Sequence, residues 1–144
     1  MADIFSPTNG TNKLECLNQD SEASLLYRDL SYQVMSAVFE VHNILGPGFL
    51  EAVYQKALLK ELQRREISAE AQKEMIVRYK GESVGSYFSD IVVNNQIILE
   101  LKTVESLKNI HVAQVMNYLK ATGYKLGILI NFAAERIEYK RIVL

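Results

Sequence analysis

The sequence has few of the residues that disulfide and zinc chemistry require. It contains one cysteine, Cys16, and two histidines among 144 residues. A single cysteine excludes an internal disulfide and suits a reducing cytosol, so we expect a cytoplasmic protein. Because structural zinc sites are built from cysteine and histidine, zinc is disfavoured as well. Any metal site would have to be built from oxygen ligands.

Long apolar runs and an excess of one charge are also missing. The longest apolar run, residues 126–130, has the length of a strand, whereas a membrane-spanning helix needs about 20 apolar residues. The first residues lack the basic start and apolar core of a signal peptide. We therefore expect no membrane association. The net charge of −1 indicates no global basic surface for nucleic acid, but it is compatible with a local basic groove.

The hydrophobic pattern predicts one domain that follows a polar tail. Residues 1–20 show no period and predict a flexible tail, and residues 21–144 predict a single domain. Apolar residues spaced by three or four predict one helix from about residue 21 to 45 and a second from about 49 to 65. A second apolar stripe with Tyr32 and Phe39 predicts that the first helix is covered on two sides. In the second helix, Leu50 and Val53 are expected to face inward.

After Ser68 the hydrophobic period changes to two, which is typical of strands. The pattern predicts three strands joined by short turns, then a helix over 109–122, then two final strands. The turns lie at "KGES" and at "NNQ", and Gly123 ends the helix. The fold class is therefore α/β, with a mixed (α+β) sheet against which the helices pack.

The clearest chemical signal is Asp90, followed ten residues later by Glu100-Leu101-Lys102. Alternate side chains of a strand share a face, so Glu100 and Lys102 project together. A two-residue turn between the strands would point Asp90 to the opposite face, whereas a three-residue turn would place it opposite Glu100. Asparagine tolerates the positive φ that such a turn needs. The sequence leaves this register open, and a bulge could also redirect Asp90.

If Asp90 and Glu100 meet, two carboxylates and an ammonium group share one small space. Close carboxylates repel unless a proton or a cation lies between them. Oxygen ligands with open positions suit Mg²⁺ or Mn²⁺, and a lysine beside the metal can orient a water or steady a phosphate oxygen. On spacing alone, a solvated charge pair is the simpler interpretation, because the chain contains a second Glu-x-Lys at Glu138. The apolar flanks of Glu100 argue against full exposure.

The helix over 109–122 carries further candidates. Gln114 and Tyr118 are four residues apart and share one helix face, with His111 one turn earlier. Both could flank the hairpin acids and contact phosphate or base. The simpler alternative is that Tyr118 packs against the sheet and Gln114 caps a backbone group. A single histidine near a helix start, such as His111, is more often structural.

Three blocks of the sequence resemble one known family in order and spacing. "GFLEAVY" is similar to the Gly-x-x-Glu-x-x-Tyr signature of the GxxExxY proteins, and "SDIVVNNQIILELKTVE" and "HVAQVMNYLKATGYKLGILINF" resemble the later blocks. The resemblance covers about residues 24–144. It implies the PD-(D/E)XK nuclease superfamily, whose core is α-β-β-β-α-β, here with an extra N-terminal helix and a C-terminal strand. Ser89 stands where the name-giving proline would be.

The resemblance also implies roles for single residues. Asp90 is similar to the metal-binding aspartate of the superfamily, and Glu100 and Lys102 to its (D/E)-x-K pair. Gln114 and Tyr118 resemble the Gln-x-x-x-Tyr helix motif of the superfamily's exonuclease-like branch. Glu51 resembles a helix acid that completes the metal site, although a carboxylate in a first helical turn is also favoured by the helix dipole alone. The candidate supporting residues are Tyr54, His42 and His111.

These patterns lead to one main hypothesis and two alternatives. The main hypothesis is a Mg²⁺- or Mn²⁺-dependent nuclease that acts on DNA or RNA. The first alternative is a catalytically inactive module that binds nucleic acid or protein and keeps the nuclease fold. The second is a hydrogen-bonded polar network that only specifies the sheet. The type of nucleic acid, the mode of cleavage and the oligomeric state, including a homo-oligomer, stay open.

Overall fold

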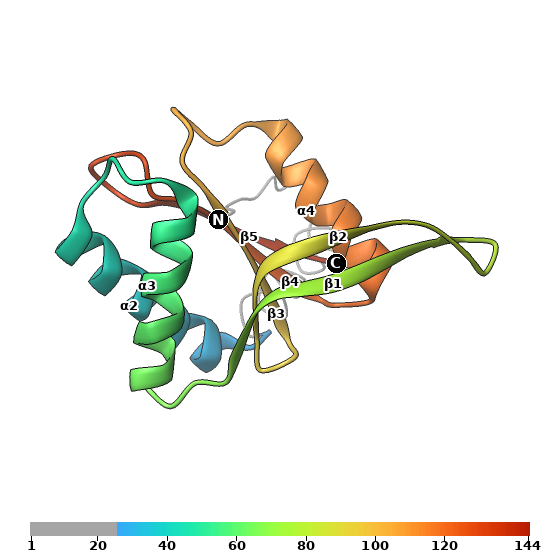
Figure 1. Cartoon of the computed structure of the whole chain (residues 1–144), viewed down its shortest axis with the longest axis horizontal. Coiled ribbons are helices and arrows are strands. Elements are labelled where there is room, and N and C mark those ends of the chain that lie inside the picture. The colour runs from blue at the N-terminus through green and yellow to red at the C-terminus, as the bar shows by residue number, and fades with distance from the viewer. Residues whose placement is uncertain (1–25) are drawn as a thin grey trace, which may run out of the picture.

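The structure is a computed structural model that describes residues 26–144, and the predicted tail lies outside these residues. Eight elements follow one another along the described chain (Figure 1). They are α2 (Arg28–Leu45), α3 (Glu51–Arg64), β1 (Ala69–Tyr79), β2 (Glu82–Val93), β3 (Ile97–Lys102), α4 (Asn109–Thr122), β4 (Leu126–Asn131) and β5 (Glu138–Val143). No helix within this part of the chain is both long and apolar enough to cross a membrane.

The five strands form one mixed sheet in the order β1-β2-β3-β4-β5. β1, β2 and β3 are antiparallel neighbours, β3 and β4 are parallel, and β4 and β5 are antiparallel. The parallel pair requires a crossover, which α4 supplies. This arrangement confirms the predicted mixed sheet. In Figure 1, β1 and β2 continue as a long hairpin that projects away from both helical layers.

Helices cover both faces of the sheet, and each face has its own apolar cluster. α2 and α3 pack on one face over a cluster that includes Val38, Leu58 and Leu99. α4 packs on the other face over a smaller cluster that includes Val92 and Leu119. β3 and β4 contribute to both clusters and are buried on both sides, and their apolar residues are interrupted in β3 by Glu100 and Lys102.

α2 and α3 are joined by the Gly-Pro-Gly loop. The loop begins at Gly46, whose φ of 71° suits glycine at the end of a helix. The second stripe of α2 is less buried than the sequence predicts, because Tyr32 is 78% exposed and Phe39 41% exposed. The inward stripe of α3 begins one turn later than expected. Leu50 precedes the helix, and Val53 lies about 100° around it from the buried Tyr54, so both are exposed.

The side-chain alternation of β2 changes phase near Asp90. Tyr87 and Val92 both pack into the cluster under α4, although they are five positions apart and strict alternation would place them on opposite faces. Opposite Asp90, Gln72 of β1 has a φ of 54°, and the pairing of β1 with β2 skips this position. An interruption of the ladder therefore lies beside the residue that the sequence marks as a metal ligand.

Candidate active site

The turn between β2 and β3 decides the register that the sequence left open. Val93 pairs with Ile97, so the loop has three residues, and the N–H of Gln96 donates to the carbonyl of Val93 over 2.9 Å. Asn94 and Asn95 both have positive φ, at 52° and 53°. In this register Asp90 falls opposite Glu100, as the three-residue alternative predicts.

Asp90 lies where β2 and β3 separate. Regular pairing of the two strands ends at Ile91, and the next backbone N–H of β3 in reach, that of Leu101, donates to Asp90 Oδ2 over 2.7 Å. The backbone carbonyl of Asp90 accepts a hydrogen bond of 2.8 Å from Gln55 Nε2 on α3. The side chain of Asp90 thus replaces a strand carbonyl, while α3 fixes its main chain.

Glu100 is a buried carboxyl with an unsatisfied oxygen. Its side chain is 8% exposed, and Oε1 is buried without a hydrogen-bond partner. Burial and the neighbouring charge of Asp90 raise the pKa of Glu100 to about 8. Burial likewise raises the pKa of Asp90, against the lowering effect of the hydrogen bond from Leu101. Because the pKa of Glu100 is about 8, this carboxyl holds a proton near neutral pH beside the charge of Asp90.

Lys102 and Glu51 complete the charged cluster. The ammonium of Lys102 lowers the pKa of both hairpin acids, whereas the charge of Glu51 raises them, which places both groups near the pair. Glu51 is the first residue of α3 and reaches the end of β3, where its Oε2 accepts from Thr103 N at 3.3 Å and from Thr103 Oγ1 at 3.4 Å. Glu51 therefore reaches the end of the site strand while it stays exposed to solvent.

The charged cluster does not form a complete metal cage. Within residues 26–144, no group of three or more His, Cys, Asp and Glu side chains is arranged to hold a metal ion. Asp90 and Glu100 still fit a divalent cation, because they are adjacent carboxylates and one buried oxygen lacks a partner. A Mg²⁺ ion commonly keeps several waters and binds one or two carboxylates. Glu51 as a third ligand stays a prediction.

Tyr54 supports the site through the loop instead of through the acids. Its hydroxyl donates to the carbonyl of Gly46 over 2.6 Å and accepts from the N–H of Phe49 at 3.2 Å. Its fully buried ring stacks on Phe132 at a centroid distance of 4.4 Å. A supporting tyrosine here could pack beneath the site or hydrogen-bond one of its acids, and the hydroxyl of Tyr54 bonds the loop and no acid. It holds the Gly-Pro-Gly loop, and thereby fixes where α3 and Glu51 begin.

Both histidines have structural partners. His42 Nε2 lies 2.9 Å from the carbonyl of Ala134 and ties α2 to the loop after β4. His111 Nδ1 accepts from the N–H of Lys108 over 2.9 Å and so caps the start of α4. Neither contacts Asp90 or Glu100, and their supporting role is therefore one of packing and capping.

Gln114 and Tyr118 lie on one face of α4, and Tyr118 is the residue of this face that feels the charges of the acids. Burial raises the pKa of Tyr118, and the charges of Glu100 and Asp90 raise it further. The ring of Tyr118 stacks on Tyr87 of β2, with centroids 3.6 Å apart and planes inclined by 14°. Gln114 is exposed and, among the described residues, caps no backbone group. It remains free to contact a ligand.

Sequence reasoning missed three residues of this region: Gln55, Tyr87 and Thr103. Gln55 lies four residues after Glu51, so the helical spacing that put Glu51 at the site could have identified it. Thr103 directly follows Lys102, and nothing in its type marks it. Tyr87 gives no signal in a strand pattern, because the phase change near Asp90 moves it to a face that alternation would not assign.

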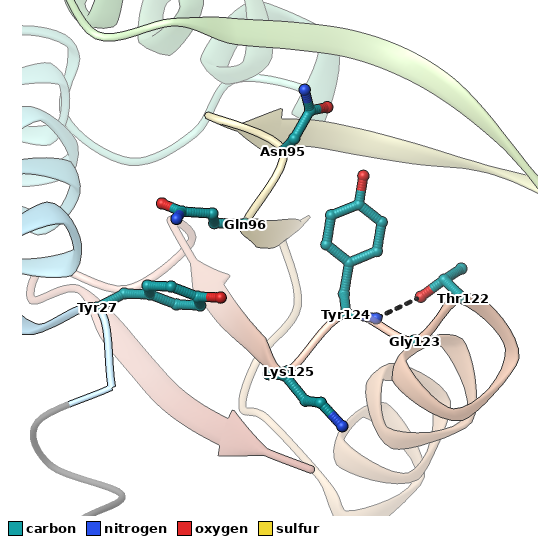
Figure 2. A pocket seen from close by; sticks show the side chains of 7 residues that line it. All are labelled: Tyr27, Asn95, Gln96, Thr122, Gly123, Tyr124 and Lys125. Carbon is teal, nitrogen blue, oxygen red and sulfur yellow. Dashed lines mark hydrogen bonds between the residues drawn. The ribbon is translucent and has the colours of Figure 1, made fainter.

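A separate hollow lies away from these acids. It has a volume of about 370 Å³ and is lined by Tyr27, Asn95, Gln96, Thr122, Gly123, Tyr124 and Lys125 (Figure 2). Gln96 directly precedes β3, whereas Lys102 ends it, so the hollow and the charged cluster lie at opposite ends of this strand. None of the candidate site residues lines the hollow.

Known proteins provide independent comparisons. The chain is similar to the crystal structure of SSO0001, with 22% identity over 85% of this chain and 61% of that one, and a TM-score of 0.49. It is also similar to an alkaline exonuclease from Laribacter hongkongensis, with 11% identity over 59% and 51% of the two chains, and a TM-score of 0.45. The chain thus spans less than two thirds of either one. No curated protein matches the sequence.

The match of the sequence to a protein family is more extensive. The model of the PD-(D/E)XK nuclease superfamily matches residues 28–142, which include all of the elements of the described chain except the last residue of β5. Asp90 and the Glu100-Leu101-Lys102 strand lie within this match, on a mixed sheet that has helices on both faces. The chain therefore belongs to the PD-(D/E)XK nuclease superfamily.

Proposed function

We propose that this protein hydrolyses phosphodiester bonds of nucleic acid with a divalent cation, Mg²⁺ or Mn²⁺, held by Asp90 and Glu100. The observation that carries the proposal is the buried Oε1 of Glu100, which lacks a partner and belongs to a carboxyl group beside that of Asp90. A buried polar atom without a partner is costly. A cation would supply that partner and would replace the proton that the raised pKa keeps on Glu100.

When bound, the cation would polarise the phosphate and lower the pKa of a coordinated water. The chain contributes the geometry. The hydrogen bond from Leu101 N–H and the bond from Gln55 to the backbone of Asp90 fix that carboxylate at the end of the paired strands. Glu51, held at Thr103, adds negative charge that favours a cation over an empty site.

Lys102 and α4 would act on the substrate. The ammonium of Lys102 makes no ion pair within 4.0 Å in the described part of the chain, although its charge acts on both acids. It is therefore available to a phosphate oxygen or to the attacking water. Gln114 would bind the substrate from the exposed face of α4, one turn from Tyr118.

The test is cleavage of single- and double-stranded DNA and RNA by the purified protein with Mg²⁺, with Mn²⁺ and with EDTA. We expect cleavage that requires the cation and is lost in Asp90→Ala, while circular dichroism and melting temperature show a folded variant. Asp29→Ala, an exposed acid in the first turn of α2, is the matched control and should cleave like the parent. Equal cleavage by Asp90→Ala, or no cleavage under any condition, would contradict the proposal.

A non-catalytic binding module is the second candidate. The absence of a three-ligand group among residues 26–144 favours it, as does the net charge of −1. A thermal titration separates the two functions, because a cation that binds only the folded state raises the melting temperature. A rise that is lost in Glu100→Gln supports the enzyme. A flat response, together with binding of nucleic acid in EDTA, supports the module.

A further inference from the structure

The hairpin of β1 and β2 extends beyond the part of the sheet that packs in the core. β3 pairs with β2 from Ile91 to Val93, so the rest of β2 pairs with β1 alone. Met75 is the buried residue of β1, and none of residues 76–86 is buried. These residues, which we call the hairpin arm, form a two-stranded ribbon that projects from the molecule (Figure 1).

The hairpin arm is longer than the fold requires. β1 and β2 have 11 and 12 residues, about twice the usual length of a strand, and a two-stranded hairpin by itself is only marginally stable in water. The arm exposes apolar surface, since Ile76 is 43% exposed and Tyr79 and Val84 are each 62% exposed. Its turn is well defined, because Lys80 and Gly81 have φ of 49° and 85°, as a tight hairpin turn requires. An ordered ribbon without a buried side chain is available to contact a partner.

The tip of the hairpin arm carries positive charge that is not paired with an acid. The arm contains two cations, Arg78 and Lys80, and one acid, Glu82, in a chain whose net charge is −1. Neither cation has a carboxylate within 4.0 Å in the described part of the chain. The ammonium of Lys80 lies 5.5 Å from the centre of the Tyr79 ring, so a cation and an aromatic ring lie together at the tip. Cations on an exposed extension attract a polyanion.

The dimensions of the hairpin arm indicate which polyanion it fits. Glu82 at the tip and Asp90 at the candidate site are eight positions apart on β2. At about 3.3 Å per residue they are about 26 Å apart, which is the length of about eight base pairs of a duplex. The major groove of B-form DNA admits a two-stranded β-ribbon, whereas that of A-form RNA is deep and narrow. A DNA duplex is also stiff over this distance, so one duplex can reach both the site and the tip.

We propose that the hairpin arm is a second contact surface for nucleic acid, which enters the major groove of duplex DNA and binds its phosphates through Arg78 and Lys80. The arm would hold the duplex about eight base pairs from the phosphate that is bound at Asp90 and Glu100. The inference rests on the proposed function in taking nucleic acid as the partner, but the contact itself needs neither a cation nor cleavage. It supplies a local basic surface in a chain that has no excess of positive charge.

Binding of DNA in EDTA tests this contact without catalysis. The double variant Arg78→Ala/Lys80→Ala, the tip variant, removes both cations. The matched control Arg136→Ala/Lys140→Ala removes an exposed arginine before β5 and an exposed lysine on β5, at the opposite edge of the sheet from β1. Fluorescence anisotropy at several salt concentrations measures the affinity for a DNA duplex of about 24 base pairs, three times the reach of the arm. Melting temperatures check that both variants are folded.

We expect the tip variant to bind duplex DNA more weakly than the parent. The slope of log affinity against log salt concentration should decrease in magnitude by about 2, because each lost phosphate contact removes about one released counterion. The control should keep the slope of the parent. Glu82→Gln, which removes the acid of the arm, should strengthen binding. On duplex RNA of the same sequence, the tip variant should bind like the parent.

Cleavage separates the hairpin arm from the proposed function. If the parent cleaves duplex DNA, the tip variant should raise KM and leave kcat unchanged, because the tip lies far from the reacting phosphate. Equal salt slopes in the parent and the tip variant would overturn the inference, as would a parent that binds no duplex DNA or an equal loss of binding on duplex RNA. If the parent binds DNA through the arm but cleaves nothing with Mg²⁺ or Mn²⁺, the proposed function fails and the inference stands.

Discussion

The same three-residue pattern, Glu-x-Lys, occurs on β3 and on β5 with opposite surroundings. On β5, Glu138 Oε1 accepts from the N–H of Leu107 at 2.9 Å and from Asn131 Nδ2 at 3.1 Å. On β3, Oε1 of Glu100 has no partner and a second acid lies beside it. Glu138 thus hydrogen-bonds the loop before α4 to the sheet, whereas Glu100 keeps an oxygen that can still accept a bond.

The position of each strand in the sheet explains the difference. β5 is an edge strand and meets one neighbour, so its polar side chains reach loops and water. β3 is central, buried on both faces, and loses its partner β2 beyond Ile91. A carboxylate placed there is removed from water without being neutralised, which raises its pKa and creates a demand for a cation. The surroundings, not the motif, create the chemistry.

The largest expected effect separates the two glutamates by activity. Glu100→Gln should lower cation-dependent cleavage by about 10³-fold or more, because losing a metal ligand removes several kcal/mol of charge stabilisation. Glu138→Gln keeps an oxygen for Leu107 N–H and should retain activity within about 3-fold. Initial rates of cleavage at saturating Mg²⁺ measure both. Similar losses of cleavage in Glu100→Gln and Glu138→Gln would show that the two glutamates do not differ in function.

Lys102 and Lys140, the lysines of the two Glu-x-Lys patterns, should also differ in their effect on activity, with the larger loss at Lys102. Lys102→Met should lower kcat by about 10²–10³-fold with little change in cation affinity, because a charge that stabilises the transition state is lost. Lys140 is exposed on β5, so Lys140→Met should leave kcat unchanged. Steady-state kinetics together with Mn²⁺ calorimetry give both numbers. A Lys102→Met variant with normal kcat would exclude a catalytic role for this ammonium.

The pH dependence of the free energy of unfolding should also distinguish Glu100 from Glu138. The pKa of Glu100 is about 8 in the folded protein, against an ordinary value of 4.5. Between these values the folded state keeps a proton that the unfolded state releases, so stability decreases as pH rises and is lowest above about 8. In EDTA, we expect the parent to lose roughly 2–4 kcal/mol relative to Glu100→Gln between pH 5 and pH 9.

Urea denaturation at several pH values measures this difference. Glu138→Gln is the matched control and should follow the pH slope of the parent, because the pair of Asp90 and Glu100 is intact in it. Adding Mg²⁺ should flatten the slope of the parent, since a bound cation replaces the proton on Glu100. A slope that is identical in the parent and in Glu100→Gln would show that the carboxyl is not held in its protonated form.

The smallest expected effect concerns Glu138, the glutamate of the Glu-x-Lys pattern on β5. Glu138→Ala removes the acceptor of Leu107 N–H and of Asn131 Nδ2, and Asn131 is fully buried. Unmade hydrogen bonds of this kind cost about 1–3 kcal/mol. We expect a corresponding decrease in the free energy of unfolding, measured in urea at pH 7. If Glu138→Ala unfolds like the parent, the network around β5 contributes nothing to stability.

Much of the fold followed from local patterns. The change of hydrophobic period at Ser68 located the boundary between helices and strands, and the glycines at 46, 48 and 123 marked where helices end. The burial of single positions was less accurate: Leu50, Val53, Tyr32 and Phe39 are apolar yet exposed. Periodicity identifies an apolar stripe, but only the packing of the neighbouring elements decides how wide a stripe is covered.

The sequence by itself determined which residues carry charge and how they are spaced: two acids on a predicted hairpin, a lysine two residues on, and an acid at a helix start. Tertiary structure alone decided that the hairpin turn has three residues, that Glu100 is buried while Glu138 is bonded, and that Tyr87 stacks on Tyr118. The physical reason is that solvation and hydrogen-bond partners come from distant segments. A carboxylate and its spacing are local properties, whereas its pKa and its unmet bonds depend on everything packed around it.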